Sequence, residues 1–250
     1  MNDKVHWNRI APTYNDEIFD VFASDKNKVL TRYFKKHWSK SKQAIDFGCG
    51  NGKAFRYLAP QFKRVLGVDI SQGLLDQAIQ RGYKNVSVQQ ADLTRPGLTL
   101  PKAEFAFCCN VIMFSDGKKN HQALKNISGN LKSGGVALLV LPALESALFS
   151  SWRLIDIYRR EGVPITEIPD EEFHYFKGKK RDLIQGIVYI DNVATKHYTA
   201  PELEVILPEA GLTLTALERI EYEWDSELAD PPTWLKGPYP WDWLVECRKA

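Results

Sequence analysis

The chain has 250 residues, 44% of them hydrophobic and 12% aromatic, which suits one large α/β domain or one domain with an elaborated cap. The formal net charge of +2 is close to neutral, so nothing in the composition indicates a nucleic-acid partner or an anionic membrane surface. The four cysteines show neither metal-ligand spacing nor a secreted disulfide framework, so no metal site is predicted. Without a recognisable signal peptide or an apolar run of membrane-spanning length, we expect a reducing, cytoplasmic location and no membrane partner.

The first 42 residues are predicted to form a helical cap. This segment contains two aromatic residues, Trp7 and Tyr14, on either side of an Ala-Pro pair, and a helix is expected over residues 26–38. Tyr14 either contacts a ligand or packs in the core, and the sequence leaves both interpretations open.

Residues 43–55 are the most informative segment because they join an apolar strand to a helix through a glycine-rich turn. The strand runs to Asp46, and Gly48, Gly50 and Gly52 then alternate through the turn. Glycine at alternate positions removes the Cβ atoms that would keep a ligand away from the backbone. Exposed N–H groups at the helix start favour a polar or anionic group. The pattern favours a nucleotide-like cofactor; a purely structural strand-to-helix turn is the alternative.

Two further predicted strands also end in acids. The apolar run over residues 64–69 ends at Asp69, about 20 residues beyond the first glycine, the offset at which a carboxylate binds ribose hydroxyls in doubly wound folds. A third run, residues 86–92, ends at Asp92 and is followed by the apolar Leu93. Three strand ends with polar groups at one edge of a sheet predict a cofactor crevice.

Residues 43–142 alternate strand and helix, which predicts a parallel sheet. Helices are expected over residues 53–60, 71–81 and 118–131, and Ser71 is the expected N-cap of the second. A fourth strand ends at Asn110, and a fifth follows the turn after residue 131.

Beyond Pro142 the alternation stops. Residues 143–185 are predicted to form an insert with a helix over 147–161, followed by a polar stretch that contains His174 and Tyr175. After an extended segment at 186–196, a helix is expected to begin at residue 199 or 200, with proline in its first turn and glycine as its stop at residue 211. The last extended segments span 212–224 and 241–247.

At the glycine turn the chain resembles the class I S-adenosylmethionine-dependent methyltransferases. The segment Asp46-Phe-Gly-Cys-Gly-Asn-Gly52 is similar to that family's first motif, an acid followed by three glycines at alternate positions. A nicotinamide oxidoreductase is an alternative, but its glycine motif would place the third glycine three residues after the second. The resemblance implies a doubly wound α/β fold, with a mostly parallel seven-stranded sheet, an antiparallel last strand, a helical N-terminal cap and a lid insert after the fifth strand.

The resemblance also implies one methyltransferase domain over residues 1–250. Its parts are the cap (1–42), the cofactor-binding core (43–142), the lid and acceptor insert (143–185) and the closing strands (186–250). The implied cofactor is S-adenosyl-L-methionine, and the product is S-adenosyl-L-homocysteine. The cofactor-binding residues implied in this way are Tyr14, Asp46, Gly48, Cys49, Gly50, Gly52, Asp69, Ile70, Asp92, Leu93 and Asn110.

Specific roles follow from the same resemblance. The three glycines would pass close to the methionine part of the cofactor, and Tyr14 would close over its carboxylate end. Asp69 would bind the ribose, Asp92 the adenine amino group, and Leu93 would flank the ring. Asn110 would lie where the methyl group is presented.

Two residues are candidate general bases, although methyl transfer does not require one. His197 precedes the helix after the insert, and histidine titrates near neutrality; the alternative is that it packs against or caps that helix. Glu145, just beyond the fifth strand, could also reach a proton of the acceptor. His174 and Tyr175 are weaker candidates in the insert.

The expected acceptor is an oxygen or nitrogen of a small molecule, with no nucleic-acid partner and an unknown oligomeric state. Asn110-Val-Ile-Met departs from the Asp/Asn-Pro-Pro-aromatic motif of nucleic-acid amino-methyltransferases, and no Pro-Cys pair for cytosine chemistry occurs. A methyltransferase acting on protein or RNA, or a non-catalytic module that binds the cofactor, remain alternatives. Four of the seven tryptophans lie in the C-terminal segment, where they either cover the sheet or form an aromatic wall for an organic or cationic acceptor.

Overall fold

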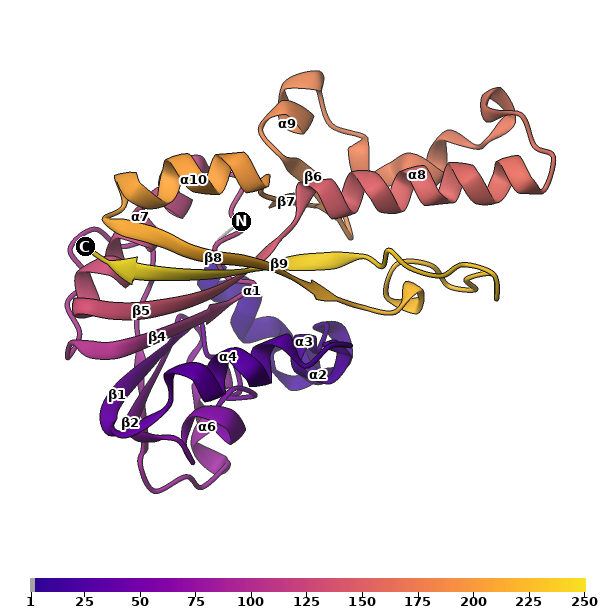
Figure 1. Ribbon diagram of the computed structural model, residues 1–250. Coiled ribbons are helices and arrows are strands. Elements are labelled where there is room, and N and C mark those ends of the chain that lie inside the picture. The colour runs from indigo at the N-terminus through magenta and orange to yellow at the C-terminus, as the bar shows by residue number, and fades with distance from the viewer. Residues whose placement is uncertain (1–2) are drawn as a thin grey trace.

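The computed structural model describes residues 3–250, and its centre is a seven-stranded sheet with helices on both faces (Figure 1). The strand order is β3-β2-β1-β4-β5-β9-β8, and only β9 runs antiparallel to its neighbours in this sheet. The strands are β1 (Ser39–Phe47), β2 (Phe62–Asp69), β3 (Val86–Gln90), β4 (Ala103–Cys109), β5 (Leu131–Pro142), β8 (Leu212–Glu221) and β9 (Trp241–Lys249). The predicted doubly wound fold with an antiparallel last strand is confirmed.

The strand order reverses at β1, which lies between β2 and β4. In open α/β sheets the crevice at such a reversal, outside the carboxyl ends of the strands, is where ligands bind. The glycine turn after β1 and Asp69 at the end of β2 both lie at this edge. The topology therefore places the predicted cofactor residues where a ligand site is expected.

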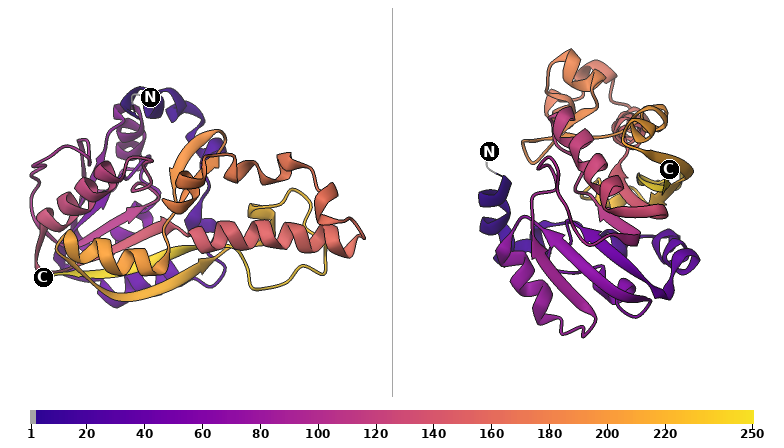
Figure 2. Two further views of the ribbon diagram at one scale, coloured as in Figure 1. Left: turned by 90° about the horizontal axis from the view of Figure 1, so that it is seen from above. Right: turned by 90° about the vertical axis from the view of Figure 1, so that its left-hand side faces the viewer.

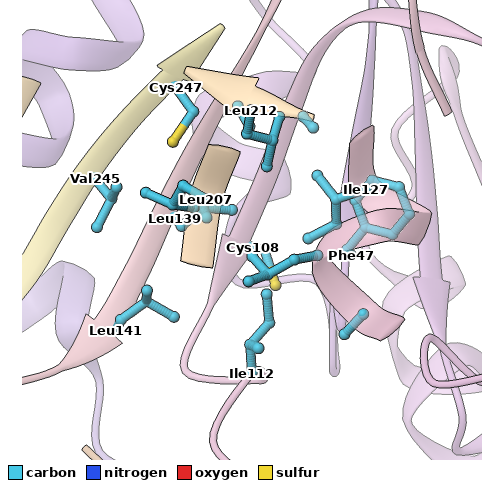
Figure 3. Packing of buried hydrophobic residues seen from close by; sticks show 14 of the residues in the cluster. Phe47, Cys108, Ile112, Ile127, Leu139, Leu141, Leu207, Leu212, Val245 and Cys247 are labelled. Carbon is cyan, nitrogen blue, oxygen red and sulfur yellow. The ribbon is translucent and has the colours of Figure 1, made fainter. Parts of the chain in front are cut away.

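Two layers of helices cover the sheet. Apolar residues of α7 (Gly117–Asn130) and α10 (Ala200–Glu209) pack in one core cluster, part of which Figure 3 shows. On the opposite face lies a second cluster, which is rich in phenylalanine. Its helices are α4 (Val29–His37), α5 (Phe55–Leu58) and α6 (Gln72–Gln80). The remaining helical segments of the N-terminal cap are α1 (Asp3–Ile10), η1 (Ala11–Thr13), α2 (Tyr14–Glu17) and α3 (Val21–Ser24).

Three helix boundaries differ from the sequence prediction. The helix expected over 26–38 is α4, which begins only at Val29, where the Asp25 carboxylate accepts from Val29 N and Leu30 N. The helix expected over 53–60 is only the short α5, because residues 51–54 continue the turn and Gly52, with φ +78°, donates to the Cys49 carbonyl. The helix expected over 147–161 is α8 (Leu144–Arg160), which begins almost directly after β5. Ser71 is the N-cap of α6, as predicted, and its Oγ accepts a hydrogen bond from Leu74 N.

The insert after β5 extends well beyond the sheet (Figures 1 and 2). It contains α8, η2 (Ile165–Glu167), η3 (Asp170–Phe176) and α9 (Lys180–Ile184), and it is followed by a hairpin of β6 (Ile187–Ile190) and β7 (Val193–Lys196). The hairpin forms a separate two-stranded sheet, and Lys196 N donates to Met113 O beyond β4, 3.0 Å away. This contact holds the insert over the carboxyl edge of the main sheet.

The segment between β8 and β9, which includes η4 (Trp224–Ser226), lies beside α8 (Figure 2). The Phe149 ring of α8 is 5.9 Å from the ring of Trp224 and 6.1 Å from that of Trp241. Three of the four C-terminal tryptophans are buried, and only Trp234 is exposed. Most of this tryptophan cluster therefore closes the core.

Within residues 3–250, no helix combines the length and apolarity that crossing a membrane requires. The same residues contain no group of three or more histidine, cysteine or acidic side chains arranged to hold a metal ion.

Candidate functional site

In the glycine turn after β1, side chains from other segments lie very close to the backbone of the glycines. Gly48, Gly50 and Gly52 all have left-handed φ values, of +69°, +52° and +78°, a conformation that favours glycine. A Cβ atom on Gly48 would lie 2.1 Å from Cγ2 of Val111, and one on Gly50 would lie 2.6 Å from the Tyr14 hydroxyl. Glycine is therefore required here both for conformation and for space.

Asp69 ties the end of β2 to this turn. One carboxylate oxygen accepts from Gly50 N and the other from Ser71 N, each at 2.9 Å. Burial raises the pKa of Asp69, while the backbone donors oppose the rise. Its position at the crevice and its remaining acceptor capacity suit the ribose role that the sequence predicted, although no contact tests that role.

Asp46 lies at the centre of the edge, and its carboxylate is almost wholly buried. Its Oδ2 atom has no hydrogen-bond partner within residues 3–250. Burial, together with the charge of Asp69, raises the pKa of Asp46 to about 8. A buried acceptor of this kind fits a cationic group, because a carboxylate without a partner is costly in a dry site.

Tyr14 brings the N-terminal cap over the turn. Its hydroxyl approaches Gly50, and burial together with the charge of Asp69 raises its pKa. The Trp7 ring lies 6.4 Å from the Tyr14 ring, so these two aromatic residues of the cap are on the same side. The cap therefore covers the glycine turn through Tyr14, and the contact of Tyr14 with a cofactor stays a prediction.

The remaining predicted cofactor residues lie near the same edge. Asp92 follows β3, and its Oδ1 accepts from the Thr94 N–H at 2.8 Å and from the Thr94 hydroxyl at 2.7 Å. Leu93 is buried, Ile70 accepts a hydrogen bond on its carbonyl from Gln90 Nε2, and Cys49 is buried under the turn. Their contacts with a cofactor stay predictions.

Asn110, at the end of β4, has a left-handed φ of +51° and connects the edge to β9. Its Nδ2 donates to Asp242 Oδ2 at 3.1 Å, and the Tyr222 hydroxyl donates to the same oxygen at 2.8 Å. The Asn110 Oδ1 atom is buried without a partner among the described residues. Strained, incompletely paired polar residues of this kind are typical of functional sites.

A second cavity adjoins this edge, between the N-terminal end of α8, the β6–β7 hairpin and the start of β9. Asp242 belongs to both places, because it lines the cavity and accepts the hydrogen bond from Asn110. The lining residues are Ala143, Ser146, Ala147, Tyr175, Val188, Ile190, His197, Glu227, Trp241 and Asp242. We call this space the acceptor-side cavity.

His197 lines the acceptor-side cavity and is buried. Its Nδ1 lies 3.2 Å from the Thr195 carbonyl, which assigns the ring proton to Nδ1 and leaves Nε2 as an acceptor. Burial, and then the charge of Lys196, lowers the pKa of His197 to about 4, although the Thr195 contact opposes this. The ring is therefore neutral near pH 7.

Glu145, the second candidate base, lies at a different place. Its Oε1 accepts from Ala200 N at 2.8 Å, at the first residue of α10, and Oε2 is buried without a partner among the described residues. This arrangement supports a capping role, and Glu145 is absent from the lining of the acceptor-side cavity. Its role as a base stays a prediction that these contacts do not favour.

Of the two weaker candidates in the insert, only Tyr175 lines the cavity. His174 is more exposed, and its Nδ1 lies 2.9 Å from the Glu171 carbonyl. Glu227 and Asp242 were missed by the sequence reasoning. Asp242 carried a signal, since it is an acid between two tryptophans in an apolar strand, whereas Glu227 carried none.

Comparison with known proteins supports the resemblance to methyltransferases. Residues 44–135 match a family model described as a methyltransferase domain. Over 117 residues the chain is 29% identical to a protein of Dictyostelium discoideum that is named as a methyltransferase, covering 45% of this chain and 40% of that protein. The chain thus spans less than half the length of this curated relative.

Solved structures share the fold at low sequence identity. A methyltransferase from Anabaena variabilis described as S-adenosylmethionine-dependent aligns with a TM-score of 0.66 at 15% identity, covering 100% of this chain and 96% of that chain. The N-methyltransferase NodS from Bradyrhizobium japonicum WM9, solved in complex with S-adenosyl-L-homocysteine, aligns with a TM-score of 0.59 at 16% identity, covering 100% and 99%.

Replacing Asp46 by asparagine tests the electrostatic cost of the site. Because the pKa of Asp46 is raised from 3.8 to about 8 in the folded protein, its ionisation removes stability progressively as the pH rises through that window. We expect the melting temperature of Asp46→Asn, minus that of the unmodified protein, to increase between pH 5 and pH 8 in calorimetric scans without ligand. Asp230→Asn, at an exposed position, should show no such trend. A constant difference for Asp46→Asn would contradict the account.

Proposed function

We propose that this chain is a class I S-adenosylmethionine-dependent methyltransferase and that it transfers a methyl group to an oxygen or nitrogen of a small-molecule acceptor. The observation that carries the proposal is the junction at Asn110 and Asp242. It joins the crevice beside the glycine turn to a separate cavity lined in part by the insert. Two adjoining sites are what a transfer between two bound molecules requires.

The residues at the crevice suit S-adenosyl-L-methionine, which supplies a methyl group on a positively charged sulfur. The glycine turn leaves room for close approach to the backbone. The unpartnered oxygen of Asp46 would accept from the ammonium group, Asp69 from the ribose hydroxyls, and Asp92 from the adenine. Leu93 would flank the ring, and Tyr14 would cover the methionine end.

On the acceptor side, the chain contributes mainly positioning and exclusion of water. Holding two reactants in a productive geometry can supply about 7–11 kcal/mol of barrier lowering, whereas a general base typically adds about 10²–10⁴-fold. His197 Nε2 would accept a hydrogen bond from an acceptor O–H or N–H and so direct the lone pair of that atom. Because its ring is neutral and weakly basic, we assign His197 the role of orienting the acceptor and not that of removing its proton.

A methyltransferase acting on protein or RNA, and a non-catalytic binding module, remain competing hypotheses. The cavity is lined on three sides by α8, the β6–β7 hairpin and the segment before β9, which favours a compact acceptor over a polymer. A radiolabelled methyl-transfer screen on metabolite, protein and RNA fractions separates the three. Labelling of metabolites alone supports the proposal, while labelling of protein or RNA, or of nothing, counts against it.

Calorimetric titration with S-adenosyl-L-homocysteine tests the donor site. We expect the unmodified protein to bind this ligand and not NAD. Asp69→Asn should weaken binding at least tenfold because it removes a charged acceptor at the ribose position, and Asp230→Asn should bind normally. Unchanged affinity in Asp69→Asn, or binding of NAD in place of the adenosyl ligand, would refute the assignment.

His197→Asn tests the acceptor side. Asparagine can keep the donor to the Thr195 carbonyl but lacks the Nε2 acceptor. We expect kcat to fall about 10²-fold, with the affinity for S-adenosyl-L-homocysteine and the melting temperature unchanged. His121→Asn, on α7 outside the cavity lining, is the matched control. Full activity of His197→Asn would remove His197 from the mechanism.

A further inference from the structure

We propose that the acceptor-side cavity selects a small molecule with a basic nitrogen, and that Glu227 and Asp242 are the residues that recognise its positive charge. This inference rests on the proposed function, because it names the acceptor class of the same site. It uses two carboxylates that the sequence did not single out.

The charged side chains that line the cavity are all acidic. Its lining contains two carboxylates, Glu227 and Asp242, and no lysine or arginine. His197 and Tyr175, the remaining titratable side chains in the lining, are both neutral near pH 7. An anionic acceptor such as a carboxylate or phosphonate would meet like charge, and no cationic side chain in the lining would compensate it.

The two carboxylates differ in their hydrogen-bond partners. Asp242 is held in place by the Asn110 amide and the Tyr222 hydroxyl. The Glu227 carboxylate has no hydrogen bond or ion pair within residues 3–250, although burial and the charge of Asp242 raise its pKa to about 7. A cation beside Glu227 would relieve both the burial cost and the repulsion between the two acids.

The aromatic residues of the cavity suit the same ligand. Trp241 is buried, lines the cavity and has an Nε1 atom without a hydrogen-bond partner among the described residues. The Arg219 guanidinium lies 4.0 Å from the Trp241 ring centroid, so this indole already binds one cation. Tyr175 also lines the cavity, and burial, followed by the charge of Glu227, raises its pKa. An organic cation can thus be held by charge and by ring contact together.

Glu227 and His197 can account for the proton and the lone pair in methyl transfer to such a nitrogen. The bound ammonium gives one proton to the Glu227 carboxylate, and the freed lone pair forms the nitrogen–carbon bond as the carbon–sulfur bond breaks. The bonding electron pair stays on sulfur, and the methylated nitrogen carries the positive charge. His197 Nε2 accepts from a remaining N–H and holds the lone pair in line.

Three matched probes test the inference: phenethylamine, 2-phenylethanol and phenylacetate, which share a ring and differ in charge. Each is added to the protein saturated with S-adenosyl-L-homocysteine, and the melting temperature is measured. Methyl transfer to each is then measured with radiolabelled S-adenosyl-L-methionine. We expect phenethylamine to raise the melting temperature and to be methylated at least tenfold faster than the other two.

Glu227→Gln removes the unpaired charge and is compared with Glu204→Gln, which changes an exposed residue of α10 in the same way. We expect Glu227→Gln to raise KM for phenethylamine at least tenfold and to keep its affinity for S-adenosyl-L-homocysteine, while Glu204→Gln changes neither. An equal or larger response to phenylacetate or 2-phenylethanol, no response to phenethylamine, or an unchanged KM in Glu227→Gln would overturn the inference. If the unmodified protein does not bind S-adenosyl-L-homocysteine, the proposed function itself is overturned.

Discussion

The site depends on the removal of carboxylates from water at the carboxyl edge of the sheet. Asp46 and Asp69 are buried there and Asp242 is half-buried, and burial raises the pKa of each. Backbone N–H groups donate to Asp69, and an amide and a hydroxyl donate to Asp242, whereas Asp46 Oδ2 has no partner among the described residues. A protein keeps such an arrangement at a cost in stability, and that cost is recovered when ligands bring positive charge or hydrogen-bond donors.

The same carboxylates connect the two halves of the proposed reaction. The antiparallel strand β9 places Asp242 beside Pro142 of β5 and within hydrogen-bond distance of Asn110 after β4. The crevice at the glycine turn and the acceptor-side cavity are therefore neighbours through one side chain. The insert and the segment before β9 both contribute residues to the wall of this cavity.

Much of the fold could be predicted because its signals are local. Apolar runs, the alternate glycines and the Ser71 N-cap each depend on a few neighbouring residues, and they locate the parallel core well. The length of α5 could not be predicted in this way. It depends on the turn at Gly52 and on space for the Phe55 ring, which a Cβ on Gly67 of β2 would fill at 2.5 Å.

The acceptor side could be predicted only in part, since its residues meet through tertiary structure. His197 was found from its place before a helix, but Glu227 comes from an irregular segment whose position depends on packing against α8. Glu145 had the right place in sequence, yet its carboxylate meets the N-terminus of α10. Which group a buried acid faces is decided by elements far away in the chain.

The central claim is that Asp46 is held protonated near neutral pH until a ligand supplies the missing cation. The most direct measurement is the calorimetric enthalpy of S-adenosyl-L-homocysteine binding at pH 7 in buffers with different ionisation enthalpies. Because burial raises the pKa of Asp46 to about 8, pairing with the ligand's ammonium group should release up to about one proton, and Asp46→Asn should abolish this release. A binding enthalpy that is independent of the buffer in the unmodified protein would contradict the account.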